Sequence, residues 1–326
     1  MELEGFRVFL KERKFEEEKL EAAIKIVGKF DNFLRGQKKS VENASYEDLY
    51  NFSDFIMEAG QNTFDNFVAL LRFGHFKGNK EVVIGALEIL DGSEMIANFS
   101  TRLQEEFGER LRNEVFRGIG IPPLGIRPEQ KVGITKELVE RFLARVDYEK
   151  CKTFFEVGLR NKYPQSYEKP IALFRELNNL DKFLKTQHQN LVKTLKTHRK
   201  DDTLFFTQEV TDEVISYVKR DQTIEAGIRQ GDQVFITKIP YSAKEFIHET
   251  DTRKKRYYYC HNPWIRHALL EEDQPIDPVF CGCSAGYFKN FWEAVLNEPV
   301  RVEVLKSFIK GDQICEFALH LPKKIP

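Results

Sequence analysis

The chain is poor in sulfur and tryptophan and has no long apolar run. Among 326 residues there are five cysteines, three methionines and two tryptophans. No stretch approaches the roughly 20 apolar residues of a membrane-spanning helix, so we expect no membrane partner. The segment from Met1 to Phe15 alternates acids and bases, which predicts no signal peptide. An odd number of cysteines without an export signal indicates a reducing cytoplasm.

The chain also lacks an excess of charge of either sign. Lys and Arg together number 50 and Asp and Glu 51, so the formal net charge is −1. This balance creates no overall field that attracts nucleic acid, and we expect no nucleic-acid partner. The sequence contains no Walker loop, no Gly-x-Gly-x-x-Gly and no His-Glu-x-x-His, which argues against the commonest nucleotide-binding and metalloprotease sites.

The spacing of apolar residues divides the chain into a helical N-terminal part and a C-terminal part that mixes helices and strands. From residue 1 to about 117, apolar residues recur at helical spacing, as in Leu20, Ala23, Ile24, Val27, Phe30 and Leu34. The Gly- and Pro-rich segment 118–125 predicts a linker. From about residue 203 the pattern becomes that of short strands, expected at 224–229, 233–239, 256–260, 300–304 and 314–321. Gln230-Gly231-Asp232 predicts a hairpin turn between the first two strands.

A length of 326 residues favours two domains. We therefore expect an α+β protein. Residues 1–120 form an all-helical domain, and residues 126–326 form a domain with a mainly antiparallel sheet and flanking helices.

Four of the five cysteines and both tryptophans lie in one window of 56 residues, from Cys260 to Cys315. Cys260 and His261 are expected to end a strand just before a helix, and Cys281 and Cys283 to stand at the start of the next helix. A helix N-terminus carries partial positive charge, which lowers a cysteine pKa and favours the thiolate. Three cysteines and a nearby histidine also match a zinc ligand set. The alternative is that these cysteines are small buried hydrophobic residues.

We expect Cys260 and the Cys281/Cys283 pair to meet in one site, and we rank these three first as metal ligands. His261 ranks second, and Cys315, on a strand of uncertain facing, ranks third. Four larger side chains of the window are candidates to contact a bound molecule: Tyr259, Trp264, Arg266 and Trp292. Gly282 and Gly286 would let the backbone approach a ligand or metal closely.

The window resembles a known family. Cys260-x-x-Pro263-Trp264, then Cys281-x-Cys283-x-x-Gly286, then Gly311-Asp312-x-x-Cys315-x-Phe317 is similar to the 4-vinyl-reductase-type small-molecule-binding domain. It is more similar still to L-2-amino-thiazoline-4-carboxylic acid hydrolase-like proteins. The resemblance covers about residues 200–322. It implies an α+β ligand-binding domain related in fold to haem/nitric-oxide sensor domains, with a cysteine-lined site for zinc or a small ligand. Asn262 stands where many relatives carry a further cysteine.

Three hypotheses for function follow. The first is a cytoplasmic protein that binds a small molecule or zinc at the cysteine site. The second is a cysteine-dependent hydrolase of a small amino- or thiazoline-carboxylate, with Cys281 or Cys283 as nucleophile and His261 as base. The third is a scaffold whose helical front half binds a partner protein. Assembly into a homo-oligomer is left open by the sequence.

Overall fold

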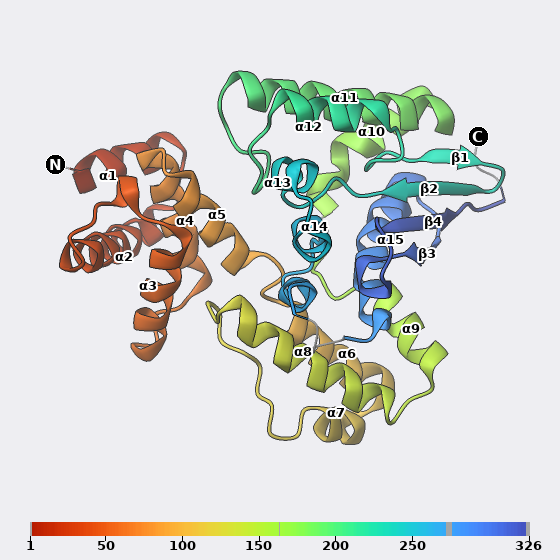
Figure 1. Ribbon diagram of the computed structural model, residues 1–326, viewed down its shortest axis with the longest axis horizontal. Helices are drawn as coiled ribbons and strands as arrows, with labels where there is room; N and C mark the ends of the chain where they lie inside the picture. The colour runs from red at the N-terminus through yellow and green to blue at the C-terminus, as the bar shows by residue number, and fades with distance from the viewer. Residues whose placement is uncertain (1, 163, 272–275, 324–326) are drawn as a thin grey trace. The chain divides into compact units, whose positions relative to one another are not determined.

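The computed structural model describes residues 2–162, 164–271 and 276–323 and shows an α+β protein (Figure 1). Its chain divides into two compact units. The N-terminal unit comprises Met1–Ser93 and Ile121–Gln130, and the C-terminal unit comprises Glu94–Gly120 and Lys131–Pro326. This division differs from the expected boundary at residue 120, because the helices of residues 94–120 pack with the C-terminal unit.

The N-terminal unit is entirely helical over its described residues, as the apolar spacing predicts. Its elements are α1 (Glu2–Glu12), α2 (Glu17–Gly36), the 3-10 helix η1 (Val41–Asn43), α3 (Tyr46–Glu58), α4 (Phe64–Lys77) and α5 (Lys80–Leu90). Phenylalanines fill much of its core; the Phe30 and Phe52 rings lie 5.0 Å apart. Asn79 ties the unit together. Its buried amide donates to the carbonyls of Val41 and Ala44 at 2.6 and 2.8 Å, and its oxygen caps α5 at the Val82 amide.

The Gly- and Pro-rich segment belongs to the N-terminal unit, where it forms a strap of residues 121–130. The Gly125 carbonyl accepts a hydrogen bond from Ser53 at 2.9 Å, and the Leu124 carbonyl accepts one from Asn62 at 2.8 Å. Arg127 pairs with the carboxylates of Glu47 and Asp54 on α3. The strap is therefore held by α3 and the residues after it.

The C-terminal unit combines helices with a sheet. Its helices are α6 (Met95–Phe107), α7 (Glu109–Val115), α8 (Pro128–Leu143), α9 (Tyr148–Glu156), η2 (Pro164–Tyr167), α10 (Glu168–Leu177), α11 (Leu180–Lys200), α12 (Asp212–Arg220), α13 (Ala243–His248), α14 (Thr252–Tyr259), η3 (Arg266–Leu269), η4 (Pro278–Cys281), α15 (Gly282–Leu296) and η5 (Phe308–Lys310). Within the described part of the chain, no helix combines the length and the apolar character needed to cross a bilayer.

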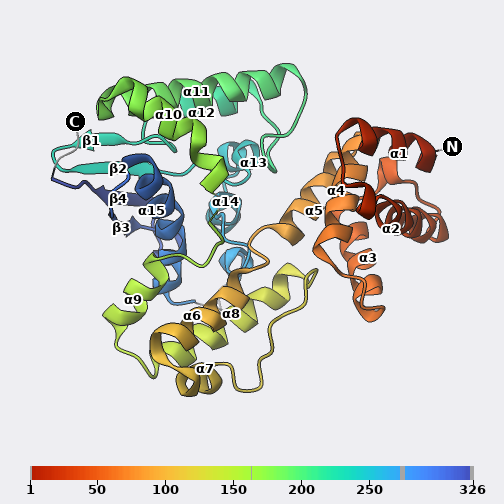
Figure 2. The same ribbon diagram turned by 180° about the vertical axis from the view of Figure 1, so that it is seen from behind.

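The sheet is antiparallel, as expected, and has four strands in the order β1-β2-β4-β3. They are β1 (Ile228–Gln230), β2 (Gln233–Thr237), β3 (Arg301–Lys306) and β4 (Glu316–His320). The hairpin turn at Gly231-Asp232 is confirmed by the pairing of Gln230 with Gln233. Helices α15, α10 and α11 share a core with the sheet (Figure 2); the Phe288 ring on α15 lies 5.0 Å from Phe317 on β4.

Of the expected strand 224–229, only Ile228 and Arg229 lie in β1, and a second expected strand is wrong altogether. Residues 256–260, read as a strand because of three consecutive tyrosines, belong to α14 and its C-terminal end. Asp251 accounts for the difference: its carboxylate accepts hydrogen bonds from the amides of Arg253 and Lys254 at 3.0 and 2.9 Å. This N-cap stabilises a helix across residues whose own preference is for strand.

Two glycines let α15 pack tightly on α9. A Cβ placed on Gly286 would stand 2.3 Å from the Cα of Gly158, and one on Gly282 would stand 2.9 Å from the Cβ of Phe155. Both approaches are closer than a real Cβ allows. These glycines thus serve helix packing, where the sequence suggested a close approach to a ligand.

Candidate functional site

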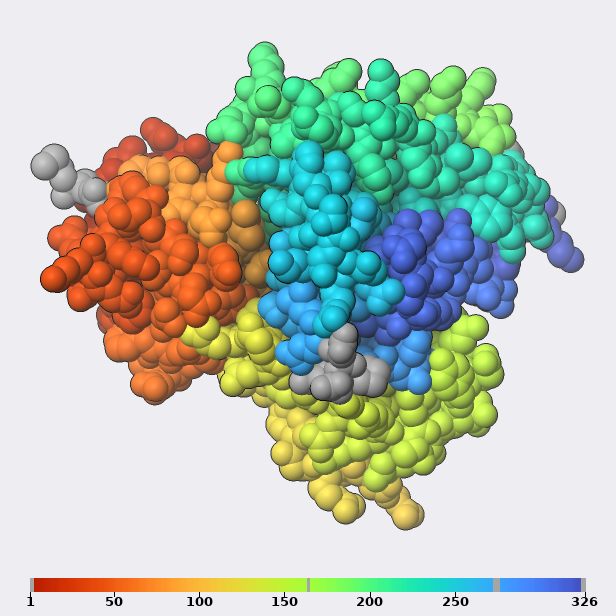
Figure 3. Space-filling view, viewed as in Figure 1, coloured from red at the N-terminus to blue at the C-terminus, as the bar shows by residue number. Residues whose placement is uncertain are grey.

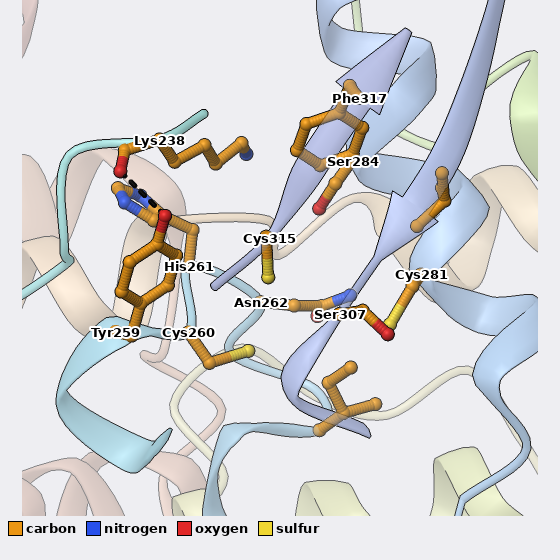
Figure 4. A pocket seen from close by; sticks show the side chains of 12 residues that line it. Lys238, Tyr259, Cys260, His261, Asn262, Cys281, Ser284, Ser307, Cys315 and Phe317 are labelled. Carbon is orange, nitrogen blue, oxygen red and sulfur yellow. Dashed lines mark hydrogen bonds between the residues drawn. The ribbon is translucent and has the colours of Figure 1, made fainter. Parts of the chain in front are cut away.

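A small cavity in the C-terminal unit gathers three of the four cysteines of the window (Figure 4). The space open to the centre of a water-sized body is about 20 Å³. The lining residues are Lys238, Tyr259, Cys260, His261, Asn262, Ile265, Cys281, Ser284, Val304, Ser307, Cys315 and Phe317. They come from the residue after β2, the end of α14 and the segment that follows it, the start of α15, β3 and the turn after it, and β4 with the residue before it.

Cys260 is placed by the way α14 docks beside the segment after β2. The amides of Tyr241 and Ser242 donate to the carbonyls of Tyr259 and Tyr258 at 3.2 and 2.8 Å. The Tyr259 hydroxyl donates to the Lys238 carbonyl at 2.8 Å, the bond dashed in Figure 4. In Figure 3 the segment of α13 and α14 adjoins the C-terminal strands on the visible face of this unit. Cys260 follows the last residue of α14 and so reaches the cavity.

Cys281 and Cys315 reach the cavity from two further segments. Cys281 is the N-cap residue of α15, which confirms its expected place at a helix start. Cys315 directly precedes β4, after a turn built by Gly311 at φ +93° and by Asp312, whose carboxylate accepts from the Ser307 amide at 2.8 Å. The Gly-Asp part of the motif therefore shapes the loop that brings Cys315 and Ser307 to the cavity.

The other expected site residues lie outside the cavity lining. Cys283 is buried on α15, where Arg102 and Arg160 act on its thiol. The Trp264 ring lies 5.6 Å from the Lys131 amine, and the Arg266 guanidinium stacks over Tyr241 and Tyr257 at 4.2 and 4.7 Å. Trp292 packs edge-on against Phe183 in the core beneath the sheet. The structure thus assembles Cys260, Cys281 and Cys315 with His261 and Tyr259, in place of the set led by Cys283.

His261 lines the cavity with one ring nitrogen already committed. Its Nε2 lies 2.6 Å from the Ile239 carbonyl oxygen, to which it donates, and its ring meets Tyr241 edge-on at 5.4 Å. These contacts fix the orientation of the imidazole. They give His261 a structural role in the turn after β2, in addition to its place on the cavity.

Burial raises the pKa of all three cavity thiols. It raises the pKa of Cys260 and Cys315, and it raises that of Cys281 to about 12, with the neighbouring Cys260 adding to the effect. The expectation of a lowered cysteine pKa is therefore wrong. Desolvation outweighs the helix-end effect, and Cys260 follows the C-terminus of α14, where the partial charge is negative.

The cavity contains residues that reasoning from the cysteines missed. Lys238, Asn262 and Ser307 are buried polar residues, and Ser284 lines the cavity from the first turn of α15. Ser284 also belongs to a Gly-x-Ser-x-Gly pattern, Gly282 to Gly286, which signals a strained nucleophile turn after a strand in some hydrolases. Here that pattern lies within α15, after the 3-10 helix η4, so the strand-to-helix turn is missing from this segment.

The cavity offers donor atoms of the kind that a soft metal ion prefers. The present spacing of these atoms, however, does not match a coordinated ion. Three thiols are the ligand type that Zn²⁺ prefers in closed protein sites. Over the residues that the structure describes, however, no three Cys, His, Asp or Glu side chains form a ready-made metal group. Metal binding would require the thiols to lose their protons and rotate toward a common centre.

Comparisons with protein-family models, with curated proteins and with solved structures find no match for this chain. The function must therefore be argued from the cavity itself.

Proposed function

We propose that this protein binds a zinc ion through the thiolates of Cys260, Cys281 and Cys315. The observation that carries the proposal is the convergence of three thiols, from three separate segments of the chain, on one cavity of about 20 Å³. The proposal agrees with the zinc site implied by the resemblance to the thiazoline-carboxylate hydrolase-like family.

The size of the cavity supports an ion over an organic ligand. Pockets for small organic molecules typically measure about 300–1,000 Å³. A space of about 20 Å³ holds one or two bodies the size of a water molecule. A metal ion with one small additional donor matches that space.

The exposed surface of the cavity is mainly apolar, but four of its lining residues other than the cysteines and the aromatic residues carry polar side chains, and these favour a site over a plain hydrophobic core. A cluster of inert buried cysteines would be surrounded by apolar side chains. Here Lys238, Asn262, Ser284 and Ser307 share the lining with the thiols. The Ser307 side chain hydrogen-bonds Cys281, and such contacts orient ligands in metal sites. Nothing comparable favours the hydrolase hypothesis, because the thiols lack the lowered pKa that a resting nucleophile needs.

All five cysteines are free thiols. We propose on this ground that the protein works in a reducing compartment, the cytoplasm, where thiols remain available to a metal.

Metal analysis of protein purified without chelator or added metal tests the proposal. We expect close to one zinc per chain in the wild type and a marked loss in Cys260→Ser, Cys281→Ser and Cys315→Ser. Cys283→Ser and Cys151→Ser are matched controls, because both remove a buried thiol outside the cavity. A wild-type protein without stoichiometric metal, or equal losses in the two controls, would overturn the proposal.

A further inference from the structure

The outer side of α11 carries five lysines that form one lysine row. These residues, all exposed, are Lys182, Lys185, Lys193, Lys196 and Lys200. Their spacings of three, four or eight residues place them on one side of a helix with about 3.6 residues per turn. The other side is buried, with Phe183 and Leu184 in the core of the sheet and Leu195 in the core shared with α12. In Figures 1 and 2, α11 runs along one edge of the C-terminal unit, with α10, α12 and the sheet to one side of it.

The lysine row has no acidic partner in the part of the chain that the structure describes. None of its five amines forms an ion pair there, whereas Arg199, elsewhere on the helix, lies 3.7 Å from the carboxylate of Asp212. The acid of α11 is Asp181 in its first turn, and none follows up to Lys200, although Asp and Glu number 51 in the chain. Lysines three or four residues apart on a helix repel one another, so the stability of α11 does not explain the row.

Neutral side chains that form hydrogen bonds accompany the lysines on the surface of α11. Gln189 stands within the row, four residues from the lysines before and after it, and Asn190, Thr194 and Thr197 are exposed as well. Between Lys182 and Lys200 the exposed residues of α11 are lysine, arginine, glutamine, asparagine and threonine, with no aliphatic or aromatic residue among them. Lysine, amide and hydroxyl groups are the side-chain groups that contact the phosphates of nucleic acids.

This composition separates the classes of partner that carry many negative charges. Interfaces between proteins are depleted in lysine and depend on buried aromatic or apolar anchors, which the exposed surface of α11 lacks. A helix that lies on a membrane inserts its apolar side into the bilayer, but the apolar side of α11 is buried in the protein. Single-stranded nucleic acid is bound by stacking its bases on aromatic rings, and the row offers none. Double-stranded DNA requires only cations and hydrogen-bond donors against its backbone.

We propose that the lysine row of α11 binds the phosphate backbone of double-stranded DNA without regard to its sequence. At about 1.5 Å per residue the row is about 27 Å long, and about eight base pairs at 3.4 Å each match that length. The ammonium groups donate charge-assisted hydrogen bonds to phosphate oxygens and release counterions from the duplex. The balanced net charge, from which we expected no nucleic-acid partner, averages over the whole chain and conceals a row confined to one helix. The row is separate from the cysteine cavity, to whose lining α11 contributes no residue among those described.

The salt dependence of DNA binding tests this inference. The full-length protein is titrated into a short fluorescein-labelled DNA duplex of arbitrary sequence, and fluorescence anisotropy gives Kd at several salt concentrations. If each of the five lysines neutralises one phosphate, the logarithm of the binding constant falls with the logarithm of the salt concentration with a slope of about −4.5. A rise from about 50 to about 200 mM salt then weakens binding about 500-fold. A second duplex of different sequence should bind equally well.

Two double variants separate the row from the net charge. Lys193→Gln/Lys196→Gln should weaken binding and make the slope shallower by about 1.8, because two phosphate contacts are lost. Lys150→Gln/Lys162→Gln changes the net charge equally at exposed lysines on and after α9, which lies at the other end of this unit in Figures 1 and 2, and should leave both quantities unchanged. Glutamine and lysine have similar helix propensities, so circular dichroism should show equal melting temperatures. Absence of duplex binding at about 50 mM salt, equal losses in the two variants, or tighter binding to single-stranded DNA, duplex RNA or phosphatidylserine vesicles overturns the inference.

Discussion

The substitution Gly286→Ala should destabilise the C-terminal unit by forcing α15 away from α9. The new Cβ would stand 2.3 Å from the Cα and 2.4 Å from the amide nitrogen of Gly158, and backbone atoms cannot yield as a flexible side chain can. Overpacking of this kind costs up to about 3 kcal/mol. Replacing a helical glycine by alanine returns about 1 kcal/mol. The net loss is about 2 kcal/mol, which lowers Tm by about 4–8 °C for a domain of this size.

Gly133→Ala is the matched control. Gly133 is an exposed residue in the interior of α8, and a Cβ there meets nothing within 4 Å. The same glycine-to-alanine change should therefore raise the free energy of unfolding by about 1 kcal/mol. Thermal unfolding followed by circular dichroism measures both variants. If Gly286→Ala melts at or above the wild-type temperature, the close contact between α15 and α9 is not what these glycines provide.

Three further predictions concern other parts of the molecule. Asn79→Ala removes two buried hydrogen bonds and a helix cap, and should lower the stability of the N-terminal unit in urea by about 3 kcal/mol; a change below about 1 kcal/mol would contradict this. The hydrogen bond from Lys77, with smaller contributions from the Glu42 backbone amide and the Ser40 side chain, lowers the pKa of Glu42 from 4.5 to about 2, so the stabilising effect of these contacts is present above pH 4.5 and is lost as the pH falls toward 2. An NMR titration should show this pKa rise toward 4.5 in Lys77→Met. Burial raises the pKa of Cys281 to about 12, so alkylation by iodoacetamide at pH 8 should be slower in the native protein than in urea by about a hundredfold or more; equal rates would show that the thiol is accessible and ionised.

The helices of the N-terminal part of the chain could be predicted from the sequence because the signals for them are local. Apolar spacing such as that of Leu20, Val27 and Phe30 marks the buried face of α2 without knowledge of the rest of the fold. Residues 256–260 show the limit of such signals. The three tyrosines favour a strand, but the N-cap at Asp251, five residues before residue 256, stabilises a helix instead. Competing local preferences of similar size cannot be ranked from residue types alone.

The candidate site could be predicted from the sequence only in part, for a different reason. Cysteine clustering pointed to the window that supplies much of the cavity lining, and the helix start at Cys281 was predicted from the residues around it. Cys281 is the N-cap of α15 and Cys283 lies in its first turn, and which of them lines the cavity depends on how α15 packs on α9. Cys281 belongs to the lining and Cys283 does not. Lys238 carried no signal, because burial of a lysine depends on contacts with segments far along the chain.

The placement of the strap limits how the protein can be divided for experiments. The chain passes between the two units at three points, after residues 93, 120 and 130. A fragment that ends at residue 93 lacks the strap and leaves the α3 residues Ser53 and Asp54 without their partners. A fragment that ends at residue 130 keeps the strap but also keeps α6, whose Phe99 packs on Phe142 and Phe155 in the intact protein. No single truncation point therefore yields a complete N-terminal unit with a covered surface. Such a unit requires deleting residues 94–120 and joining Ser93 directly to Ile121.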